Sequence, residues 1–342
     1  MSPESHDVTD ADRPTVSIVM PIFNRRAFLL AAFDAILSQS IDSWELIVVD
    51  DGSTDDSREL VAAFQARVPQ VVKYVPQVNQ GAYGARNTGV ALATGRYIAF
   101  YDSDDVWLPH HLPTSVLALN AHADVDWVYS ASEIVDLESG RMLDENCFYQ
   151  GGRPRPFMAL KHEARGPLRV IKDAGAIECQ ITHGLYCGMQ NSVLRRRVFD
   201  RLRFAWEMRN EAEDQLFAIR ALSAGFTLAY VDRVHVRYHV HAGNSSGAAK
   251  DASLAKLKRV YEPLIAGYEH LAREISLTPR ERRALKRRLA HELFWHLGYA
   301  GYWQAGERSD AVKTYRRAIS FWPWSFAQWK TYALARLRLL SS

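Results

Sequence analysis

Three aspartates crowd one short segment, and their spacing is typical of a metal site. Asp102, Asp104 and Asp105 lie within YDSDDVW (101–107), after an apolar run that predicts a strand. Like-charge repulsion makes such crowding costly. A hard divalent cation such as Mg²⁺ or Mn²⁺ removes that cost, because it prefers oxygen ligands, and it would neutralise a departing diphosphate. An Asp-rich turn without metal has the same composition, so this alternative stays open.

Two further segments would place polar groups beside a nucleotide. In VVDDGSTDD (48–56), Asp51 would lie at a sheet edge and accept an N–H group of a base, although Asp-Gly-Ser is also ordinary turn chemistry. In NQGAYGARNTG (79–89), glycines let the backbone approach a ligand closely. Arg86 would there face a base or a diphosphate. The sequence contains neither GxGxxG nor GxxxxGK(S/T).

Two segments later in the chain add candidate groups. Glu213 and Asp214 begin a predicted helix in NEAEDQLFAIRAL. Acidic residues are favourable in any first helical turn, so the pair has a structural explanation beside a chemical one. His241, in YHVHAGNSS (238–246), precedes a Gly-Asn-Ser loop and is a candidate metal ligand, although lone histidines are usually structural.

The hydrophobic pattern predicts the elements that position these groups. Apolar, β-branched runs alternate with segments of helical spacing, which predicts an α/β fold with a mostly parallel sheet covered on both faces. Ligands bind beyond the carboxyl ends of such strands, where the motifs lie. Strands are predicted at 15–23, 44–49, 71–75, 97–101, 127–129, 227–231 and 234–239. Helices are predicted at 27–38, 83–93, 109–122 and 213–224.

Other parts of the chain have weaker signals. Ser53 and Thr54 are predicted to cap a helix that ends near Gln65. Residues 188–199 are predicted to form a strand that runs into a helix, and 140–180 have no clear pattern. From about residue 252 the chain is predicted to be helical, with breaks at Pro263, Pro279 and Pro323.

The composition separates the chain into an acidic and a basic part. Of its 342 residues 48% are hydrophobic, enough for one large domain with an appendage or for two domains. Residues 250–342 contain 18 Lys and Arg against 8 Asp and Glu, whereas residues 1–249 contain 24 against 31. The basic part is typical of a polyanionic or membrane-surface partner, or of a solvated helical surface.

Three cysteines without a CxxC pair argue against a disulfide scaffold or a structural zinc site and favour the cytoplasm. The beginning of the chain lacks the apolar region of a signal peptide, and no run of eighteen apolar residues predicts a membrane span. Nucleic acid is not an expected partner, because no nucleic-acid-binding motif is recognised.

In order and spacing, these segments resemble the glycosyltransferases of family 2, which have the GT-A fold. The resemblance rests on VSIVMPIFN, ILSQSIDSWELIVVDDGSTDDS, NQGAYGARNTGVALATGRYIAFYDSDDVW, the Glu-Asp pair and YHVHAGNSS. It implies a GT-A catalytic domain at 15–249, with a nucleotide-binding half at 15–107 and an acceptor half at 108–249. Residues 1–14 are expected to be disordered, and residues 250–342 to form a basic helical extension.

The resemblance also implies roles for individual residues. The loop after the first strand lines the nucleotide pocket in this family. The expected nucleotide-binding residues are Pro21, Phe23, Asn24, Asp51, Arg86 and Asp102. Asp104 is expected to bind Mn²⁺ or Mg²⁺ directly, with Asp102, Asp105 and His241 as further candidates. Asp51 would recognise the base, typically uracil.

Asp214 is expected to be the general base of an inverting displacement on a nucleotide-diphosphate sugar, and the family's usual pattern implies a UDP-linked donor. Nothing matches the QxxRW motif of processive synthases, which favours transfer of a single sugar. The acceptor would be a glycan or a lipid-linked molecule, as in polysaccharide biosynthesis.

The basic extension contains one segment that fits a tetratricopeptide unit, residues 297–323. The fitting residues are Leu297, Gly298, Tyr302, Gly306, Ala311, Tyr315, Ala318 and Pro323. A helical cap on the catalytic domain and a docking surface both remain open. Trp, Tyr, Lys and Arg in the tail are typical of an interfacial helix, so peripheral contact with the inner face of a membrane is one expectation.

Two other functions fit the sequence less well than sugar transfer. A nucleotidyltransferase would need a glycine-rich, basic loop after the first strand, where this chain has PIFNRR. A non-catalytic binding module would be expected to have lost the aspartate cluster or the Glu-Asp pair, and both are present.

Overall fold

The computed structural model describes residues 13–205, 213–241 and 253–340. The chain forms two compact units. The first contains residues 1–172, 186–207 and 225–240, and the second contains 173–185, 208–224 and 241–342. Disorder is expected from the sequence for residues 1–14. Residues 1–12 of this segment lie outside the described part.

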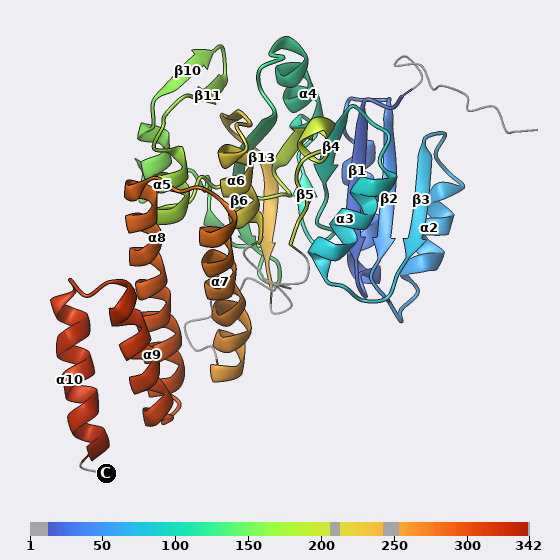
Figure 1. The fold of residues 1–342 in the computed structure, drawn as a ribbon. Helices are drawn as coiled ribbons and strands as arrows, with labels where there is room; N and C mark the ends of the chain where they lie inside the picture. The colour runs from blue at the N-terminus through green and yellow to red at the C-terminus, as the bar shows by residue number, and fades with distance from the viewer. Residues whose placement is uncertain (1–12, 206–212, 242–252, 341–342) are drawn as a thin grey trace, which may run out of the picture. The chain divides into compact units, whose positions relative to one another are not determined.

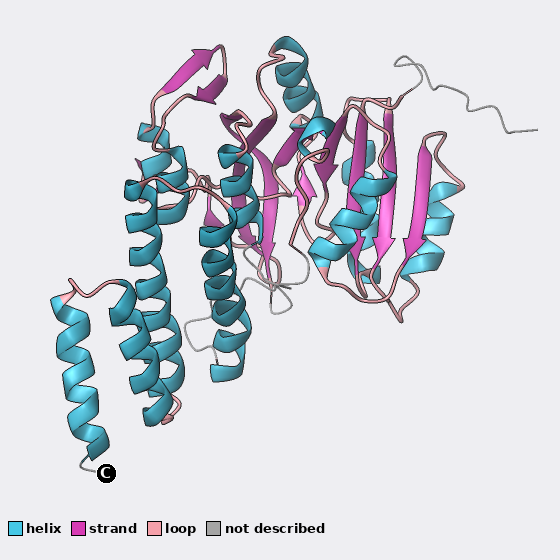
Figure 2. Ribbon diagram, viewed as in Figure 1, coloured by secondary structure: helices cyan, strands magenta, loops and turns pink. Residues whose placement is uncertain are grey.

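The first half of the first unit is a parallel sheet with helices between its strands (Figures 1 and 2). Its strands are β1 (Val16–Ile22), β2 (Trp44–Asp50), β3 (Val71–Pro76) and β4 (Tyr97–Phe100). Its helices are α1 (Arg26–Leu37), α2 (Ser57–Gln65) and α3 (Ala82–Leu92). The central strands are buried on both faces, which explains their continuous apolar sequences. Helices α1 and α2 share one face, where Phe33 and Phe64 stack with ring centroids 4.1 Å apart.

The same sheet continues into a second half that is mixed in direction. The strand order is β10-β11-β13-β6-β12-β4-β1-β2-β3, with β5 added to β13 and β7 to β6. Strand β12 is antiparallel to both β4 and β6, and it therefore joins the two parallel regions. These strands are β5 (Val106–Trp107), β6 (Trp127–Asp136), β7 (Met142–Asp144), β10 (His162–Arg165), β11 (Leu168–Ile171), β12 (Ser192–Arg195) and β13 (Leu228–Val240).

Shorter elements complete this unit. Helix α4 (His111–Ala121) precedes β6, and two single turns of 3₁₀-helix are η1 (Pro156–Ala159) and η2 (Arg196–Val198). Strands β8 (Tyr149–Gln150) and β9 (Arg153–Pro154) form a separate pair. The α/β fold predicted from the sequence is confirmed, with the antiparallel β12 as the main departure from a parallel sheet.

Two local predictions for this unit were wrong. Helix α2 begins at Ser57 with Asp56 at its N-cap, so Ser53 and Thr54 do not cap it. Ser53 instead accepts a hydrogen bond from the backbone of Asn24 at 2.9 Å, because the turn after β2 is tied to the turn after β1. The two strands predicted at 227–231 and 234–239 form one long strand, β13, whose pairing with β6 shifts register between Val231 and Val236.

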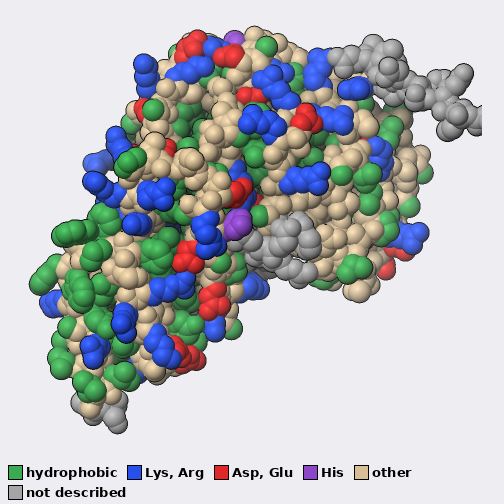
Figure 3. All heavy atoms as spheres, in the orientation of Figure 1, with side chains coloured by type: hydrophobic (Ala, Val, Ile, Leu, Met, Phe, Trp, Pro, Cys, Tyr) green, Lys and Arg blue, Asp and Glu red, His purple; other side chains and the backbone are tan. Residues whose placement is uncertain are grey.

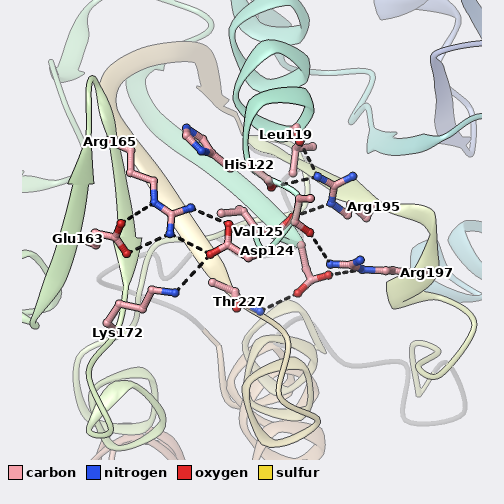
Figure 4. A network of polar contacts seen from close by, with 12 residues as sticks. Leu119, His122, Asp124, Val125, Glu163, Arg165, Lys172, Arg195, Arg197 and Thr227 are labelled. Atoms are coloured by element: carbon pink, nitrogen blue, oxygen red, sulfur yellow. Dashed lines mark hydrogen bonds and ion pairs between the residues drawn. The ribbon is translucent and has the colours of Figure 1, made fainter.

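The β10–β11 hairpin, in the region without a clear pattern, is attached by ion pairs (Figure 4). Arg165 contacts both carboxylate oxygens of Asp124, at 2.6 and 2.9 Å, and also binds Glu163. These contacts hold the pKa of Asp124 well below its usual range. Beside them, Asp126 binds Arg197 at 2.6 Å and accepts the backbone N–H of Thr227.

The second unit is helical (Figure 1). It contains α5 (Ala176–Thr182), α6 (Glu213–Ser223), α7 (Leu254–Glu274), α8 (Pro279–His291), the π-helical η4 (Glu292–Trp303), α9 (Arg308–Phe321) and α10 (Phe326–Leu340). Its core joins Leu216 and Ile219 of α6 with apolar residues of the later helices. No helix in the described ranges is long and apolar enough to cross a membrane.

The three prolines of this unit have different effects. Pro263 lies inside α7, so the break predicted there was wrong. Pro279 opens α8, where Thr278 and Glu281 form a capping box, and Pro323 lies between α9 and α10. Helices η4 and α9 pack closely, because Gly298 has no side chain where the ring of Tyr315 lies.

Candidate active site

The loops that follow β1 and β2 are tied together by Asn24. Asn24 has a positive φ of 53°, which non-glycine residues adopt rarely and mostly in functional or tightly constrained turns. Its side-chain oxygen accepts the backbone N–H of Thr54 at 2.8 Å. The neighbouring Phe23 is 49% exposed. An exposed aromatic ring at a strand end offers a flat apolar surface, such as a base or ribose requires.

Asp51 organises the next pair of loops. Its side chain is buried, and it accepts hydrogen bonds from Gln77 Nε2 at 2.7 Å and from the backbone N–H groups of Gln80 and Gly81 at 2.8 and 2.7 Å. The carboxylate therefore holds the glycine-containing loop after β3 against the end of β2.

Asp102, the first aspartate of the cluster, is paired with Arg86 of α3. Arg86 Nη2 lies 2.5 Å from Asp102 Oδ1, and the Arg86 side chain is only 6% exposed. The guanidinium also lies over the rings of Tyr83 and Phe100, at 4.8 and 5.9 Å from their centroids. Arg86 is thus buried behind Asp102 and orients this carboxylate.

Asp104 lies between an arginine and a histidine that the sequence interpretation had not selected. Arg25, in the loop after β1, places Nη2 at 3.3 Å from Asp104 Oδ2. His239 of β13 places Nδ1 at 2.7 Å from the backbone oxygen of Asp104. A positive charge therefore already lies beside the cluster, at the edge formed by the β1 and β4 loops.

Asp105 is the most unusual group of the cluster. It is buried, and its Oδ1 accepts the backbone N–H of His239 at 3.1 Å. Among the residues that the structure describes, its Oδ2 has no hydrogen-bond partner. Burial, followed by the charges of Asp102 and Asp104, raises the pKa of Asp105 well above its usual range. A buried carboxylate with an unused oxygen is costly unless a cation or a proton satisfies it.

These observations test whether the cluster suits a divalent metal. No group of three Asp, Glu, His or Cys side chains in the described ranges is already arranged around a metal position. The unused oxygen of Asp105 and the neighbouring Asp102 and Asp104 are nevertheless hard oxygen donors, as Mg²⁺ and Mn²⁺ require. The residues present therefore fit such an ion.

Glu213 and Asp214 begin α6 in the second unit, and they differ in environment. Glu213 is fully buried and binds Arg220 at 2.5 Å, and Arg220 in turn binds Glu274 of α7 at 2.9 Å. Asp214 is partly exposed, and its Oδ1 accepts the backbone N–H of Gln215 at 2.8 Å. Glu213 therefore anchors the helix start, which leaves Asp214 as the group at the surface. His241 also belongs to the second unit, and residues 242–246 of its motif lie outside the described part.

Hydrogen bonds and one ion pair thus link the predicted residues of the first unit. Asn24 binds the loop after β2, Asp51 binds the loop after β3, and Arg86 binds Asp102. Sequence reasoning missed Arg25 and His239. Both belong to motifs already noted, PIFNRR and YHVHAGNSS, but no local signal distinguishes them from their neighbours. Only the pairing of β5 with β13, in which Val236 faces Trp107, brings His239 beside the aspartates.

Known proteins resemble this chain in sequence and in fold. The family model described as glycosyl transferase family 2 matches residues 17–200. The chain is 35% identical over 125 residues to an Escherichia coli protein named UDP-Glc:alpha-D-GlcNAc-diphosphoundecaprenol beta-1,3-glucosyltransferase, covering 36% of this chain and 48% of that protein. The chain spans about a third to a half of the length of the first two curated relatives that it matches, 37% and 48%.

Solved structures share the GT-A fold. Staphylococcus aureus TarS 1–349 in complex with UDP-GlcNAc matches with a TM-score of 0.59 and 18% identity, over 90% of this chain and 81% of that one. A mannosyltransferase from Pyrobaculum calidifontis, in complex with GDP-Man and Mn²⁺, matches with a TM-score of 0.56 and 18% identity, over 99% and 84% of the two chains.

Proposed function

Because the chain belongs to glycosyl transferase family 2, we propose that it moves a single sugar from a nucleotide-diphosphate sugar to a hydroxyl group of an acceptor. The observation that carries this proposal is the buried Asp105, with its unused oxygen beside Asp102 and Asp104. A divalent ion bound for sugar transfer would offset the cost of that buried carboxylate.

The proposed donor carries UDP. The E. coli relative is named for UDP-Glc, and TarS was solved with UDP-GlcNAc, whereas the P. calidifontis protein was solved with GDP-Man. Pro21 and Phe23 would contact the base and the ribose, and Asp51 would accept the N–H group of uracil. The rigid hydrogen bonding of Asp51 supports this role, because a fixed acceptor discriminates between bases better than a mobile one.

The proposed cofactor is Mn²⁺ or Mg²⁺, held by Asp104 and Asp105 with help from Asp102. His241 remains a further candidate ligand. Such an ion supplies charge neutralisation for the leaving diphosphate. Arg86 would keep Asp102 in position, and Arg25 would contribute a second positive charge beside the diphosphate.

In the proposed reaction, Asp214 accepts the proton of the acceptor hydroxyl as its oxygen attacks the anomeric carbon. The new bond joins acceptor oxygen to that carbon, and the bond from the carbon to the diphosphate oxygen breaks with its electrons on the nucleoside diphosphate. Attack opposite the leaving group inverts the anomeric centre, so an α-linked donor gives a β-linked product. The buried Glu213–Arg220 pair would hold the helix start that carries Asp214.

The proposed acceptor is a glycan or a lipid-linked sugar, as the name of the E. coli relative states for that protein. The catalytic part would extend over residues 15–249 and the basic helical extension over 250–342. We place the reaction in the cytoplasm, at the inner face of a membrane if the acceptor is lipid-linked. The three cysteines are buried and form no disulfide, which agrees with a reducing compartment.

Release of nucleoside diphosphate tests the proposal without an acceptor. The full chain is incubated with UDP-Glc, UDP-GlcNAc, UDP-Gal and GDP-Man, each with Mn²⁺ or with EDTA, and slow donor hydrolysis is followed. We expect release from one UDP sugar that stops with EDTA. If no donor is hydrolysed and no nucleotide raises the melting temperature, the chain is a non-catalytic module and the proposal is wrong.

A further inference from the structure

Helix α10 packs against other helices of the second unit with its more polar face. Gln328 and Ala335 are buried, and Thr331 and Tyr332 are half-buried. These positions are three or four residues apart and therefore share one side of a helix. Gln328 Nε2 also donates to the backbone oxygen of Ala290 in α8 at 3.3 Å. The inward side is therefore defined by packing and by a hydrogen bond.

The opposite side of α10 is apolar and faces outward. Phe326, Leu337 and Leu340 are 81%, 64% and 80% exposed. Trp329 and Leu334 flank them at 47% and 49% exposed. A helix on the surface of a soluble domain normally buries its apolar stripe and exposes its polar one. Helix α10 does the reverse, and such an exposed patch marks an interaction surface.

The charged residues in this last part of the chain are all basic. Residues 311–342 contain six Lys and Arg and no Asp or Glu. Lys330 lies on the outward side between Phe326 and Leu337, and Arg336 lies at its border. Figure 3 shows hydrophobic and basic side chains intermixed over the part of the surface that α10 forms in Figure 1.

We infer that the outward side of α10 docks on an anionic lipid surface. Lipid supplies an apolar layer for Phe326, Trp329 and Leu337, and negative headgroups for the basic residues beside them. A second copy of the chain fits less well, because a two-fold contact would set Lys330 and Arg336 against the same residues of the other copy. No acidic residue between 311 and 342 could offset that repulsion.

The helix would lie flat in the headgroup region. Its fifteen residues correspond to about 22 Å at 1.5 Å per residue, which is shorter than a bilayer core. The charged residues near its exposed side also suit an interfacial position rather than a span. This inference depends on α10 alone and would hold whichever sugar, or no sugar, is transferred.

Vesicle binding by the full chain tests the inference. Cosedimentation is measured with vesicles of phosphatidylcholine alone and with vesicles that also contain phosphatidylglycerol. We expect binding only to the anionic vesicles, weakened by added salt. The double variant Phe326→Glu, Leu337→Glu should lower this binding about tenfold or more, because two exposed apolar groups are replaced by charges of the wrong sign.

The matched control is Leu30→Glu, Leu117→Glu, which makes the same change at positions of the first unit that are 57% and 70% exposed. It should bind like the unmodified protein. Equal losses of vesicle binding in the two double variants would mean that net charge alone determines this binding, and the inference would be wrong. It would equally be wrong if the unmodified protein ignored anionic vesicles, or if ultracentrifugation showed a dimer that only the α10 variant separates. Donor hydrolysis in solution, measured beside these assays, reports on the proposed reaction independently.

Discussion

At the scale of single residues, the proposed metal site consists of three neighbouring aspartates with three different environments. Asp102 is paired with Arg86, Asp104 lies beside Arg25, and Asp105 is buried with an oxygen unused among the described residues. Their side chains are alike, so the differences arise from burial and from the charges around them. A cation would satisfy Asp105 in particular, because its second oxygen is buried and unused among the described residues.

Asp104→Ala tests the predicted metal ligand. We expect donor binding by this variant to lose its dependence on Mn²⁺ and to weaken at least about tenfold, since a charged oxygen ligand is removed. Isothermal titration with UDP, with and without Mn²⁺, measures the effect. Asp34→Ala, which changes an exposed aspartate of α1, is the control and should bind like the unmodified chain. An Asp104 variant that binds UDP as tightly as the unmodified chain, with the same dependence on Mn²⁺, would contradict the assignment.

Asp214→Asn tests the proposed base. The variant keeps the shape of the side chain but loses most of its basicity, so transfer to an acceptor should fall about 10²- to 10⁴-fold. Donor affinity and melting temperature should stay unchanged, because the anchoring Glu213–Arg220 pair is intact. Comparing kcat for transfer with the dissociation constant for UDP separates the two effects. Full transfer activity in this variant would show that another group takes the proton.

At the scale of elements, loops rather than helices or strands carry the predicted site. The loops after β1, β2 and β4 lie at the carboxyl ends of parallel strands, as expected for an open α/β sheet. The long strand β13 then adds a contact from the mixed half of the sheet, through its pairing with β5. In the second unit, the close packing of η4 on α9 depends on one glycine, Gly298.

Gly298→Ala tests this helix contact. A methyl group at Gly298 would meet Tyr315 Cε1 at 2.8 Å and the backbone oxygen of Leu293 at 2.9 Å. We therefore expect a loss of about 1–3 kcal/mol in the free energy of unfolding, although Gly→Ala inside a helix ordinarily stabilises by about 1 kcal/mol.

Urea unfolding followed by circular dichroism measures the change. Gly301→Ala is the control, because its nearest neighbour is the flexible end of Leu254 at 3.3 Å. It should be neutral or mildly stabilising. A Gly298 variant as stable as this control would show that the two helices adjust without cost.

At the scale of the whole molecule, acid stability depends on two histidines in the first unit. His111 and His235 are fully buried with ring centroids 5.7 Å apart, and within the described structure their ring nitrogens lack hydrogen-bond partners. Burial, assisted by the neighbouring His110, lowers the pKa of His235 to about 3, and burial lowers that of His111 well below its usual value. Both rings are therefore neutral in the folded protein.

The lowered pKa values of these two histidines determine how the stability of the fold changes with pH. The unfolded chain binds protons at these histidines below about pH 6.5, whereas the folded chain does not, so acid favours unfolding. Together the two groups should lower the free energy of unfolding by about 4 kcal/mol between pH 7.5 and pH 5. The raised pKa of Asp105 acts in the opposite direction and offsets part of this loss.

Urea unfolding across this pH range measures the loss, and His235→Phe should remove about half of the histidine contribution. His270→Phe, which makes the same change at a histidine that is 56% exposed, is the control. Identical pH profiles for His235→Phe and the unmodified chain would contradict the prediction.

The sequence by itself determined the alternation of strands and helices in the first hundred residues and the order of the motifs. Both are local properties: apolar runs predict buried strands, and a family is recognised by motif spacing. The same locality explains why Pro279 and Pro323 were placed correctly, since proline acts on its own backbone.

Only the tertiary structure decided which residues meet. Strand β12 enters the sheet antiparallel between β4 and β6, His239 reaches Asp104 across 135 positions of sequence, and Ser53 binds Asn24 instead of capping α2. The outward apolar side of α10 also became visible only when its inward side was known. The physical reason is that pairing and burial depend on contacts between distant segments, whose register no local pattern records.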